Sequence, residues 1–367
     1  MRVAASGERA AGKGGMSEIR VAVVPGDGIG VDVTAEAVRV LETVAASSER
    51  KVRLTRFEWG AEHFLKTGVT LPEGALQDLT ENFDAILLGA MGDPRVPDNR
   101  HAADILLGLR FRLDLYVNYR PVKLFHEKLC PLKGVAPKDV NFVVFRENTE
   151  GLYVMMGGNF KKGTPEEVAT EIDLNTRIGV ERIIRRAFEY ARTHGRKKVV
   201  MGDKSNVLIH AHDLWQRTFR IVAAEFPEIA AIHLYADNLA MQMVKSPAQF
   251  EVIVTSNMFG DIVTDIGAAL QGGLGMAASG NIHPGRGSLF EPVHGSAPKF
   301  AGKNVANPMG AILTAGLMLE HLGWTEESRR IEDAVRWAVE SNTTTADIGG
   351  KLGTREVGKA IADRLRK

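Results

Sequence analysis

The stretch IRVAVVPGDGIG, residues 19–30, joins a short run of mostly β-branched residues to a turn rich in glycine. The run predicts a buried strand over Ile19–Val24, and an amphipathic helix is expected from about Val31 to Ala46. The same alternation of apolar runs with longer amphipathic segments continues along the chain. It is typical of an α/β fold that contains much parallel sheet.

Further segments extend this pattern. Apolar runs predict strands at residues 83–88, 141–145, 198–201 and 250–255. Between them a helix is predicted with an apolar face formed by Val180, Ile183, Ile184, Ala187, Phe188 and Ala191. Another, buried helix is expected to start near Asn307 and Pro308, with the asparagine as N-cap and the proline at the first helical position.

The length and charge of the chain limit its function classes. Its 367 residues suffice for two domains, and 46 basic against 45 acidic side chains leave a net charge of +1. This balance gives no bulk electrostatic reason to expect binding to nucleic acid or to an anionic membrane. The single cysteine, Cys130, cannot form an intrachain disulfide, which fits a cytoplasmic location. We also find no apolar run of the roughly 18 residues that a membrane span needs.

Two basic segments need separate interpretation. The first 15 residues lack the apolar block of a secretory signal, and we expect a flexible extension ahead of Met16. One face of the helix predicted around residue 185 carries Arg182, Arg185, Arg186 and Arg192. A nucleic-acid-binding module is the alternative there, but Glu181 and Glu189 share the helix, so a solvated face is the better interpretation.

A pair of acids marks the segment NMFGDIVTDI, residues 257–266. On a helix, Asp261 and Asp265 stack on one face and repel each other, and no basic residue lies one turn away in the sequence. A divalent cation would relieve this repulsion, and oxygen ligands favour Mg²⁺ or Mn²⁺. Asp237 is a candidate third ligand, whereas an exposed acidic edge is the alternative. The apolar stripe expected beside the acids consists of Phe259, Ile262, Val263 and Ile266.

Arginines and two proton-transfer candidates accompany these acids. The arginines are Arg110, Arg112, Arg120 and Arg146. Guanidinium groups bind carboxylates with two parallel hydrogen bonds, so several beside a metal would suit a di- or tricarboxylic acid, although each alone fits an ordinary ion-pair residue. Lys204 directly follows a predicted strand, where α/β sites form, and Tyr153 is the second candidate for proton transfer.

Two glycine-containing loops are candidates for nucleotide binding. Gly26, Gly28 and Gly30 follow a strand but miss the G-x-G-x-x-G spacing, so a standard Rossmann fold is disfavoured. The loop EPVHGSAP, residues 291–298, offers backbone amides and His294 to a nucleotide, or it is a structural turn.

Taken in order, the motifs GDGIG, DLYVNYRP, RENTEGLY, DKSNV, NMFGDIVTDI and EPVHGSAP resemble those of the β-decarboxylating dehydrogenases. This family includes isocitrate, 3-isopropylmalate, homoisocitrate, tartrate and D-malate dehydrogenases. The resemblance implies a two-domain, isopropylmalate-dehydrogenase-like α/β fold that is not of the standard Rossmann type, with the active site in the interdomain cleft. Domain 1, on the nucleotide side, would combine residues 16–115 and 273–367, and domain 2, on the dimerisation and metal side, would be residues 116–272.

The resemblance also implies roles for individual side chains. Tyr153 and Lys204 would form the catalytic pair, and the metal ligands would be Asp237, Asp261 and Asp265. Arg110, Arg120 and Arg146 would bind the substrate carboxylates. Lys204 and Asp237 would enter from the partner subunit of a homodimer. The implied nucleotide-binding residues are Glu291, His294, Gly295, Ser296, Ala297, Lys299 and Asn307.

The substrate prediction depends on three apolar positions. Leu106, Leu107 and Val207 would form an apolar wall, where each buried methylene contributes about 0.8 kcal/mol. Such a wall favours 3-isopropylmalate, converted to 2-oxoisocaproate in leucine biosynthesis. The motif RENTEGLY resembles other branches of the family than the 3-isopropylmalate enzymes, and Ala103 stands where those enzymes usually have a glutamate. Isocitrate, homoisocitrate, D-malate and tartrate therefore stay alternative substrates. A non-catalytic regulatory subunit would carry substitutions at the catalytic or metal positions, and none is present.

The cofactor prediction depends on Lys299. NAD-using relatives carry an aspartate there, whereas a lysine resembles NADP-using isocitrate enzymes. The segment 346–350 lacks the tyrosine and arginine that those enzymes add. The resemblance therefore favours NAD, with NADP not excluded, together with Mg²⁺ or Mn²⁺.

Overall fold

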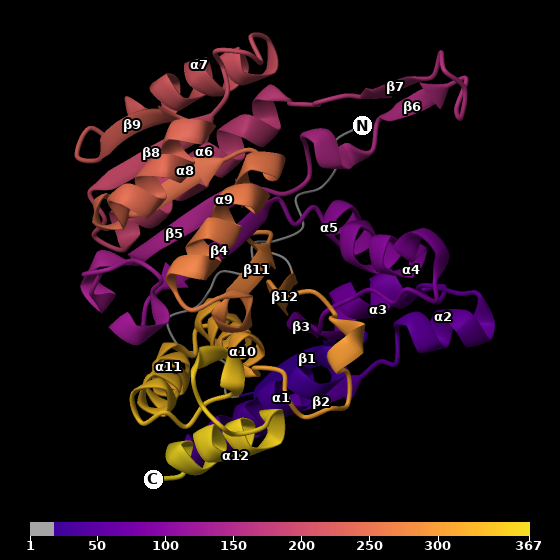
Figure 1. Cartoon of the computed structure of the whole chain (residues 1–367), viewed down its shortest axis with the longest axis vertical. Coiled ribbons are helices and arrows are strands. Elements are labelled where there is room, and N and C mark those ends of the chain that lie inside the picture. Colours follow the sequence, from indigo (N-terminus) through magenta and orange to yellow (C-terminus); the bar gives the residue numbers. More distant parts are fainter. Residues whose placement is uncertain (1–17, 286) are drawn as a thin grey trace. The chain divides into compact units, whose positions relative to one another are not determined.

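The computed structural model describes residues 18–285 and 287–367, so the extension expected at residues 1–15 lies outside the described residues. The described chain forms two compact units (Figure 1). The first unit combines the described residues up to Leu109 with Ile282–Lys367, and the second is Arg110–Asn281. None of the described helices is long and apolar enough to cross a membrane.

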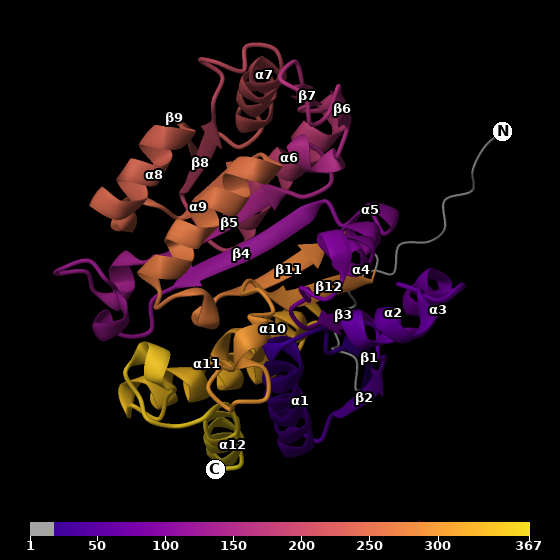
Figure 2. The same cartoon turned by 45° about the vertical axis from the view of Figure 1, so that its right-hand side comes forward.

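The first unit contains four parallel strands in the order β2-β1-β3-β12. They are β1 (Glu18–Val24), β2 (Lys51–Arg56), β3 (Ala85–Leu88) and β12 (Ser288–Pro292). Its long helices are α1 (Ile29–Ser47), α10 (Met309–His321), α11 (Thr325–Glu340) and α12 (Thr354–Leu365), which pack against one another (Figure 2). Shorter helices are α2 (Ala61–Thr67), α3 (Ala75–Asn82) and α4 (Arg100–Ala102). A π-helical turn, Ala103–Leu107, follows α4 and continues into α5 (Gly108–Arg112).

The second unit contains strands in the order β11-β4-β5-β10-β8-β9. They are β4 (Val117–Lys123), β5 (Asn141–Glu147), β8 (Lys198–Asp203), β9 (Ala230–Tyr235), β10 (Val252–Thr255) and β11 (Ala278–Ile282). β4 and β5 pair antiparallel, whereas β5, β10, β8 and β9 are parallel. The helices are α6 (Arg177–Thr193), α7 (Ala211–Ala223), α8 (Ala236–Lys245) and α9 (Asn257–Leu270). A separate hairpin, β6 (Gly157–Phe160) and β7 (Val168–Glu171), projects from this unit (Figure 1).

The structure confirms the predicted strands and the apolar face of α6. Each of the six residues expected on that face is buried. The start predicted for α10 is wrong by one residue, because Pro308 is the N-cap and the helix begins at Met309. Asn307 still caps the helix from outside, since its Oδ1 accepts a hydrogen bond from the Met309 N–H at 3.0 Å.

The stripe predicted for α9 is wrong at Ile262, whereas Val263 is buried and Phe259 and Ile266 are half-buried. Ile262 is 54% exposed, whereas Gly260, Val263, Thr264 and Gly267 face the protein interior. The physical reason is close packing: a Cβ on Gly260 would lie 2.5 Å from Cγ of Arg146. Small residues therefore let α9 approach β4 and β5, and this approach decides which face is buried.

Candidate active site

Two of the expected substrate arginines lie on adjacent strands of the second unit. Arg120 of β4 pairs with Val144 of β5, and Arg146 of β5 pairs with Asn118. Residues two positions apart across an antiparallel pair point to the same face, so both guanidinium groups lie on one side of the sheet. α9, which carries Asp261, packs against the same two strands (Figures 1 and 2).

Asp261 contacts both arginines and Tyr153. Its Oδ1 accepts hydrogen bonds from Nη1 of Arg146 at 2.5 Å and from Nη2 of Arg120 at 3.3 Å. Its Oδ2 accepts a hydrogen bond from the Tyr153 hydroxyl at 3.0 Å, and the Arg146 guanidinium lies 5.3 Å from the Tyr153 ring centre. The structure thus brings two expected substrate-binding arginines, the expected catalytic tyrosine and one expected metal ligand into contact.

Burial sets the charge states in this cluster. Arg146 is 1% exposed, and burial, reinforced by Arg120, lowers its pKa to about 9, so it remains charged at neutral pH. Its Nε and Nη2 donate to Oδ1 of Asn257 at 3.0 and 2.7 Å, which fixes the plane of the guanidinium. Burial would raise the pKa of Asp261, but Arg146 and Arg120 outweigh it, and the pKa lies below its usual value. Burial raises the pKa of Tyr153, so its hydroxyl keeps its proton.

The acids on α9 fit one side of a divalent-cation site. Burial, and then the negative charge of Asp261, raise the pKa of Asp265, and together they outweigh the opposite effect of Arg120 and Arg146. In the described part of the chain its carboxylate has neither a hydrogen bond nor an ion pair. A carboxylate without a partner beside a second carboxylate suits Mg²⁺ or Mn²⁺, which prefer oxygen ligands.

The third acid does not join them within one chain. No group of three potential metal-binding side chains occurs among residues 18–285 and 287–367 of one chain, so the expectation that Asp237 enters from a partner subunit stays a prediction. Asp237 instead accepts a hydrogen bond from Nζ of Lys204 at 2.6 Å, which lowers its pKa. It is 70% exposed on its side chain and therefore accessible to another subunit.

Strand register explains the pairing of Lys204 with Asp237. β8 and β9 run parallel, with Asp203 opposite Tyr235, and Lys204 follows directly after the first of these strands. Asp237 lies in the first turn of α8, directly after β9. The carboxyl ends of both strands thus bring the two side chains together, as is common for sites in α/β proteins.

The three residues expected to form the apolar wall belong to different units. Leu106 and Leu107 lie half-buried in the π-helical turn of the first unit, a type of turn that is frequent at functional sites and that the sequence pattern did not indicate. Val207 lies in the second unit, exposed, and its N–H donates to the Lys204 carbonyl at 3.0 Å. Val207 therefore belongs to the loop that carries the expected catalytic lysine.

The expected nucleotide loop follows β12 in the first unit and contacts the glycine turn before α1. The Ile29 N–H donates to the Ser296 carbonyl at 2.8 Å. Gly28 has a φ of 55°, and a Cβ on it would lie 2.1 Å from that same oxygen, so only glycine fits there. The two glycine-containing loops of the sequence therefore form one surface.

His294 is the residue of this loop that fits a nucleotide. It is buried, and burial lowers its pKa, so its ring is neutral at pH 7. Nδ1 lies 3.0 Å from the Gly295 carbonyl, which requires the proton on Nδ1 and leaves Nε2 as an acceptor. Nε2 is buried without a hydrogen-bond partner in the described chain, and an amino group of a nucleotide base would satisfy it.

The other expected nucleotide residues are placed as follows. Lys299 is exposed in a short 3₁₀ turn, with its Nζ 4.8 Å from the Phe300 ring centre. The Asn307 amide donates to Oδ2 of Asp347 at 3.1 Å. Glu291 is buried at the end of β12, and Gly295 and Ala297 flank Ser296 in the loop.

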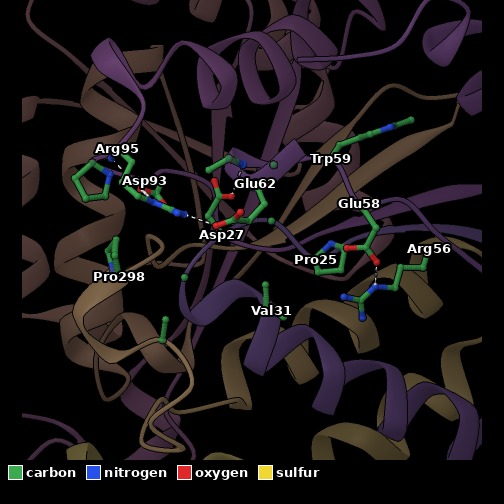
Figure 3. A pocket seen from close by; sticks show the side chains of 16 residues that line it. Pro25, Asp27, Val31, Arg56, Glu58, Trp59, Glu62, Asp93, Arg95 and Pro298 are labelled. Carbon is green, nitrogen blue, oxygen red and sulfur yellow. Dashed lines mark hydrogen bonds and ion pairs between the residues drawn. The ribbon is translucent and has the colours of Figure 1, made fainter. Parts of the chain in front are cut away.

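A cavity of about 500 Å³ in the first unit was not indicated by the sequence (Figure 3). Its wall includes the turn Pro25–Gly28, the residues after β2 and the segment 93–95. Figure 3 shows the Arg56–Glu58 pair on this wall, and the Arg95 guanidinium is paired with Glu62 and Asp93. These charges are already neutralised, so the cavity carries no clear preference for a charged ligand.

The model of the isocitrate/isopropylmalate dehydrogenase family matches residues 20–361, and the chain belongs to this family. A relative named 3-isopropylmalate dehydrogenase from Thermobifida fusca is 46% identical, over 95% of this chain and 98% of that protein. Another of the same name from Beutenbergia cavernae is 48% identical, over 93% of this chain and 99% of that protein.

Solved structures agree with this assignment. The crystal structure of isocitrate dehydrogenase from Methylococcus capsulatus matches with a TM-score of 0.86 and 38% identity, covering 95% of this chain and 100% of that chain. The resemblance inferred from the sequence motifs and the fold class are therefore confirmed.

Proposed function

We propose that the protein catalyses the oxidative decarboxylation of 3-isopropylmalate to 2-oxoisocaproate with NAD and Mg²⁺ or Mn²⁺, in leucine biosynthesis. The observation that carries this proposal is the convergence of Arg120, Arg146 and Tyr153 on Asp261. Such a cluster suits a dicarboxylate that is bound beside a cation and receives a proton. The names of the curated relatives support the choice of substrate.

Substrate binding is assigned to the arginines. Arg120 and Arg146 would form charge-assisted hydrogen bonds to the malate carboxylates, and Arg110, which adds to the positive field around Asp261, would bind with them. Because Arg146 is held by Asn257, its guanidinium is oriented before the substrate arrives. Such preorganisation reduces the entropy lost on binding.

The cofactors would be held by acids of α8 and α9 and by the loop after β12. Asp261 and Asp265, with Asp237 of the partner subunit, would hold the cation, and His294 with the loop 293–299 would hold NAD. When bound, the cation acidifies the substrate hydroxyl and withdraws charge from the developing carbonyl, and NAD accepts the hydride.

Proton transfer is assigned to Lys204 and Tyr153. Lys204 of the partner would accept the proton of the substrate hydroxyl, directly or through water. After carbon dioxide leaves, the Tyr153 hydroxyl would protonate the carbon that carried the carboxylate. Its raised pKa keeps that proton available, and its hydrogen bond to Asp261 holds the hydroxyl in place.

The proposed homodimer is supported by exposed apolar side chains on two helices in contact. Met241 and Val244 on α8 and Ile262 on α9 are exposed, and the two helices pack together. The β6–β7 hairpin adds Phe160 and Val168, both exposed. A second copy covering these side chains would bury them and would bring Lys204 and Asp237 to a neighbouring site.

A rate comparison tests the substrate. Purified protein with Mn²⁺ and NAD is expected to turn over 3-isopropylmalate with the highest kcat/KM among 3-isopropylmalate, isocitrate, homoisocitrate, D-malate and tartrate. The physical reason is burial of the isopropyl group, about 0.8 kcal/mol per methylene. NADH formation at 340 nm measures the rates. Faster turnover of isocitrate or D-malate would overturn the substrate assignment, and turnover of none of the acids would favour a non-catalytic subunit.

Nucleotide preference is tested at Lys299. Lys299→Asp is expected to lower kcat/KM for NADP by about tenfold while changing that for NAD less, because a carboxylate repels the 2′-phosphate. Lys303→Asp, at another exposed lysine after the same turn, is the control and should leave the NADP/NAD ratio unchanged. An unchanged ratio in Lys299→Asp would remove this position from nucleotide recognition.

A further inference from the structure

The main chain of Lys204 is held on both sides. Its N–H donates to Nδ1 of His212 at 2.9 Å, and its carbonyl accepts from the N–H groups of Val207 and Leu208 at 3.0 and 2.9 Å. His212 lies in the first turn of α7, eight residues further along the chain. A side chain of this helix therefore fixes the peptide from which the lysine side chain extends.

His212 is itself fixed from three directions. It is 1% exposed and stands edge-on to the Phe259 ring of α9, with the ring centres 5.6 Å apart at 90°. Its Nε2 lies 3.7 Å from Oδ2 of Asp173, two residues after β7. Because Nδ1 accepts a hydrogen bond, the neutral ring carries its proton on Nε2, toward that carboxylate.

The Asp173 end of this chain of contacts is also anchored. Oδ1 of Asp173 accepts from the Asn175 amide at 2.9 Å, and Oδ1 of Asn175 accepts from Nε1 of Trp215 at 2.8 Å. Trp215 is buried on α7, one turn after His212. The base of the β6–β7 hairpin and the start of α7 are thus joined around His212.

The His212 ring is in the neutral form, which can accept a hydrogen bond at Nδ1. Burial lowers the pKa of His212, although Asp173 and Asp203 act in the opposite direction. The neutral ring therefore persists near pH 7, and Nδ1 keeps the lone pair that binds the Lys204 N–H.

We propose that His212 is a positioning residue for Lys204, joining the catalytic loop to the base of the β6–β7 hairpin. This inference rests on the proposed role of Lys204. A displacement of a reacting group by about 1 Å lowers rates by about 10²-fold, so a main-chain hydrogen bond at the catalytic lysine affects kcat. Substrate and cation binding, which are assigned to other residues, would be affected much less.

Two amide substitutions separate positioning from simple packing. In His212→Asn the amide oxygen takes the place of Nδ1 and can accept from the Lys204 N–H, whereas in His212→Gln the amide lies near Nε2 and cannot. Both variants bury one amide in place of the imidazole ring, so similar losses of stability are expected from each. Thermal unfolding of both proteins checks that they are folded to the same extent.

Kinetics gives the first readout. His212→Gln is expected to lower kcat for 3-isopropylmalate by about 30-fold with KM changed less than threefold, and His212→Asn to retain kcat within about fivefold of the wild type. Equal kcat values in the two variants, or a loss confined to KM, would overturn the proposal.

Hydrogen exchange of the Lys204 amide gives a readout independent of activity. Mass spectrometry or NMR should find this amide protected in the wild type and in His212→Asn, and exchanging at least tenfold faster in His212→Gln. If the wild type turned over none of the acids, the proposed function would fail. The exchange pattern would still show whether His212 holds the Lys204 amide. Equal exchange in all three proteins would refute it.

Discussion

Lys204→Met is expected to lower kcat for 3-isopropylmalate by about 10²–10⁴-fold, the range typical of a lost general acid or base. Methionine keeps most of the unbranched stem and removes the ammonium group that donates to Asp237. Arg120, Arg146 and Asp261 are unchanged, so substrate and Mn²⁺ should still bind. Steady-state kinetics and calorimetric titration measure the two effects. Lys245→Met, which removes an exposed charge from α8, is the control and should retain the kcat of the wild type.

Mixing variants tests whether the lysine acts in the partner's site. Lys204→Met and Tyr153→Phe should each be nearly inactive alone. If each site combines the tyrosine of one subunit with the lysine of the other, a mixed dimer has one intact site, and random exchange of subunits restores about a quarter of the activity. If both residues act within one subunit, no mixed dimer has an intact site. Retained turnover in Lys204→Met, by contrast, would remove the lysine from proton transfer altogether.

The sequence predicted the place of Lys204 in the fold well because its signal is local. A β-branched run followed directly by Lys204 predicts a strand end, and β8 ends at Asp203. The same holds for the two acids of α9, whose spacing predicts a helix that the structure contains. Short-range periodicity is sufficient for such features, since each depends on the few residues around it.

The contacts of Asp261 could not be obtained in this way. Its partners Arg146 and Arg120 are 115 and 141 residues away along the chain, on strands whose antiparallel pairing places both on one face. β4 was missed because it carries Arg120, Pro121 and Lys123, and a proline disfavours a strand assignment. Without β4, local sequence patterns could not place the arginines beside the acids.

The error on α9 has a similar origin. Counting apolar residues selected Ile262 for the buried face, whereas close approach to Arg146 selected Gly260. Hydrophobicity indicates which residues gain from burial, but here the short distance between helix and sheet decides which residues fit. A charged side chain that is buried between a helix and a sheet, as Arg146 is here, needs small residues on the helix that covers it.

Arg146→Met is expected to lower kcat/KM for 3-isopropylmalate by about 10²–10³-fold, mostly through KM. Truncating one partner of a desolvated charge pair in a binding site costs about 2–5 kcal/mol of binding free energy, and the partial exposure of Asp261 places the effect at the lower end of that range. Oδ1 of Asn257 would also lose the two hydrogen bonds that it accepts from Arg146, so a lower melting temperature should accompany the kinetic effect. Steady-state kinetics and calorimetry measure these changes.

Arg112→Met is the matched control for this prediction. Arg112 lies on α5 of the same region, carries the same charge and is exposed, and no role is assigned to it. Its replacement should leave kcat/KM within about twofold of the wild type. If the two variants behaved alike, the effect of Arg146 would be one of net charge, and the substrate carboxylates would have to bind elsewhere. A large loss in Arg146→Met alone requires a guanidinium at this one position, held by Asn257 and facing Asp261, because both variants lose the same unit of net charge.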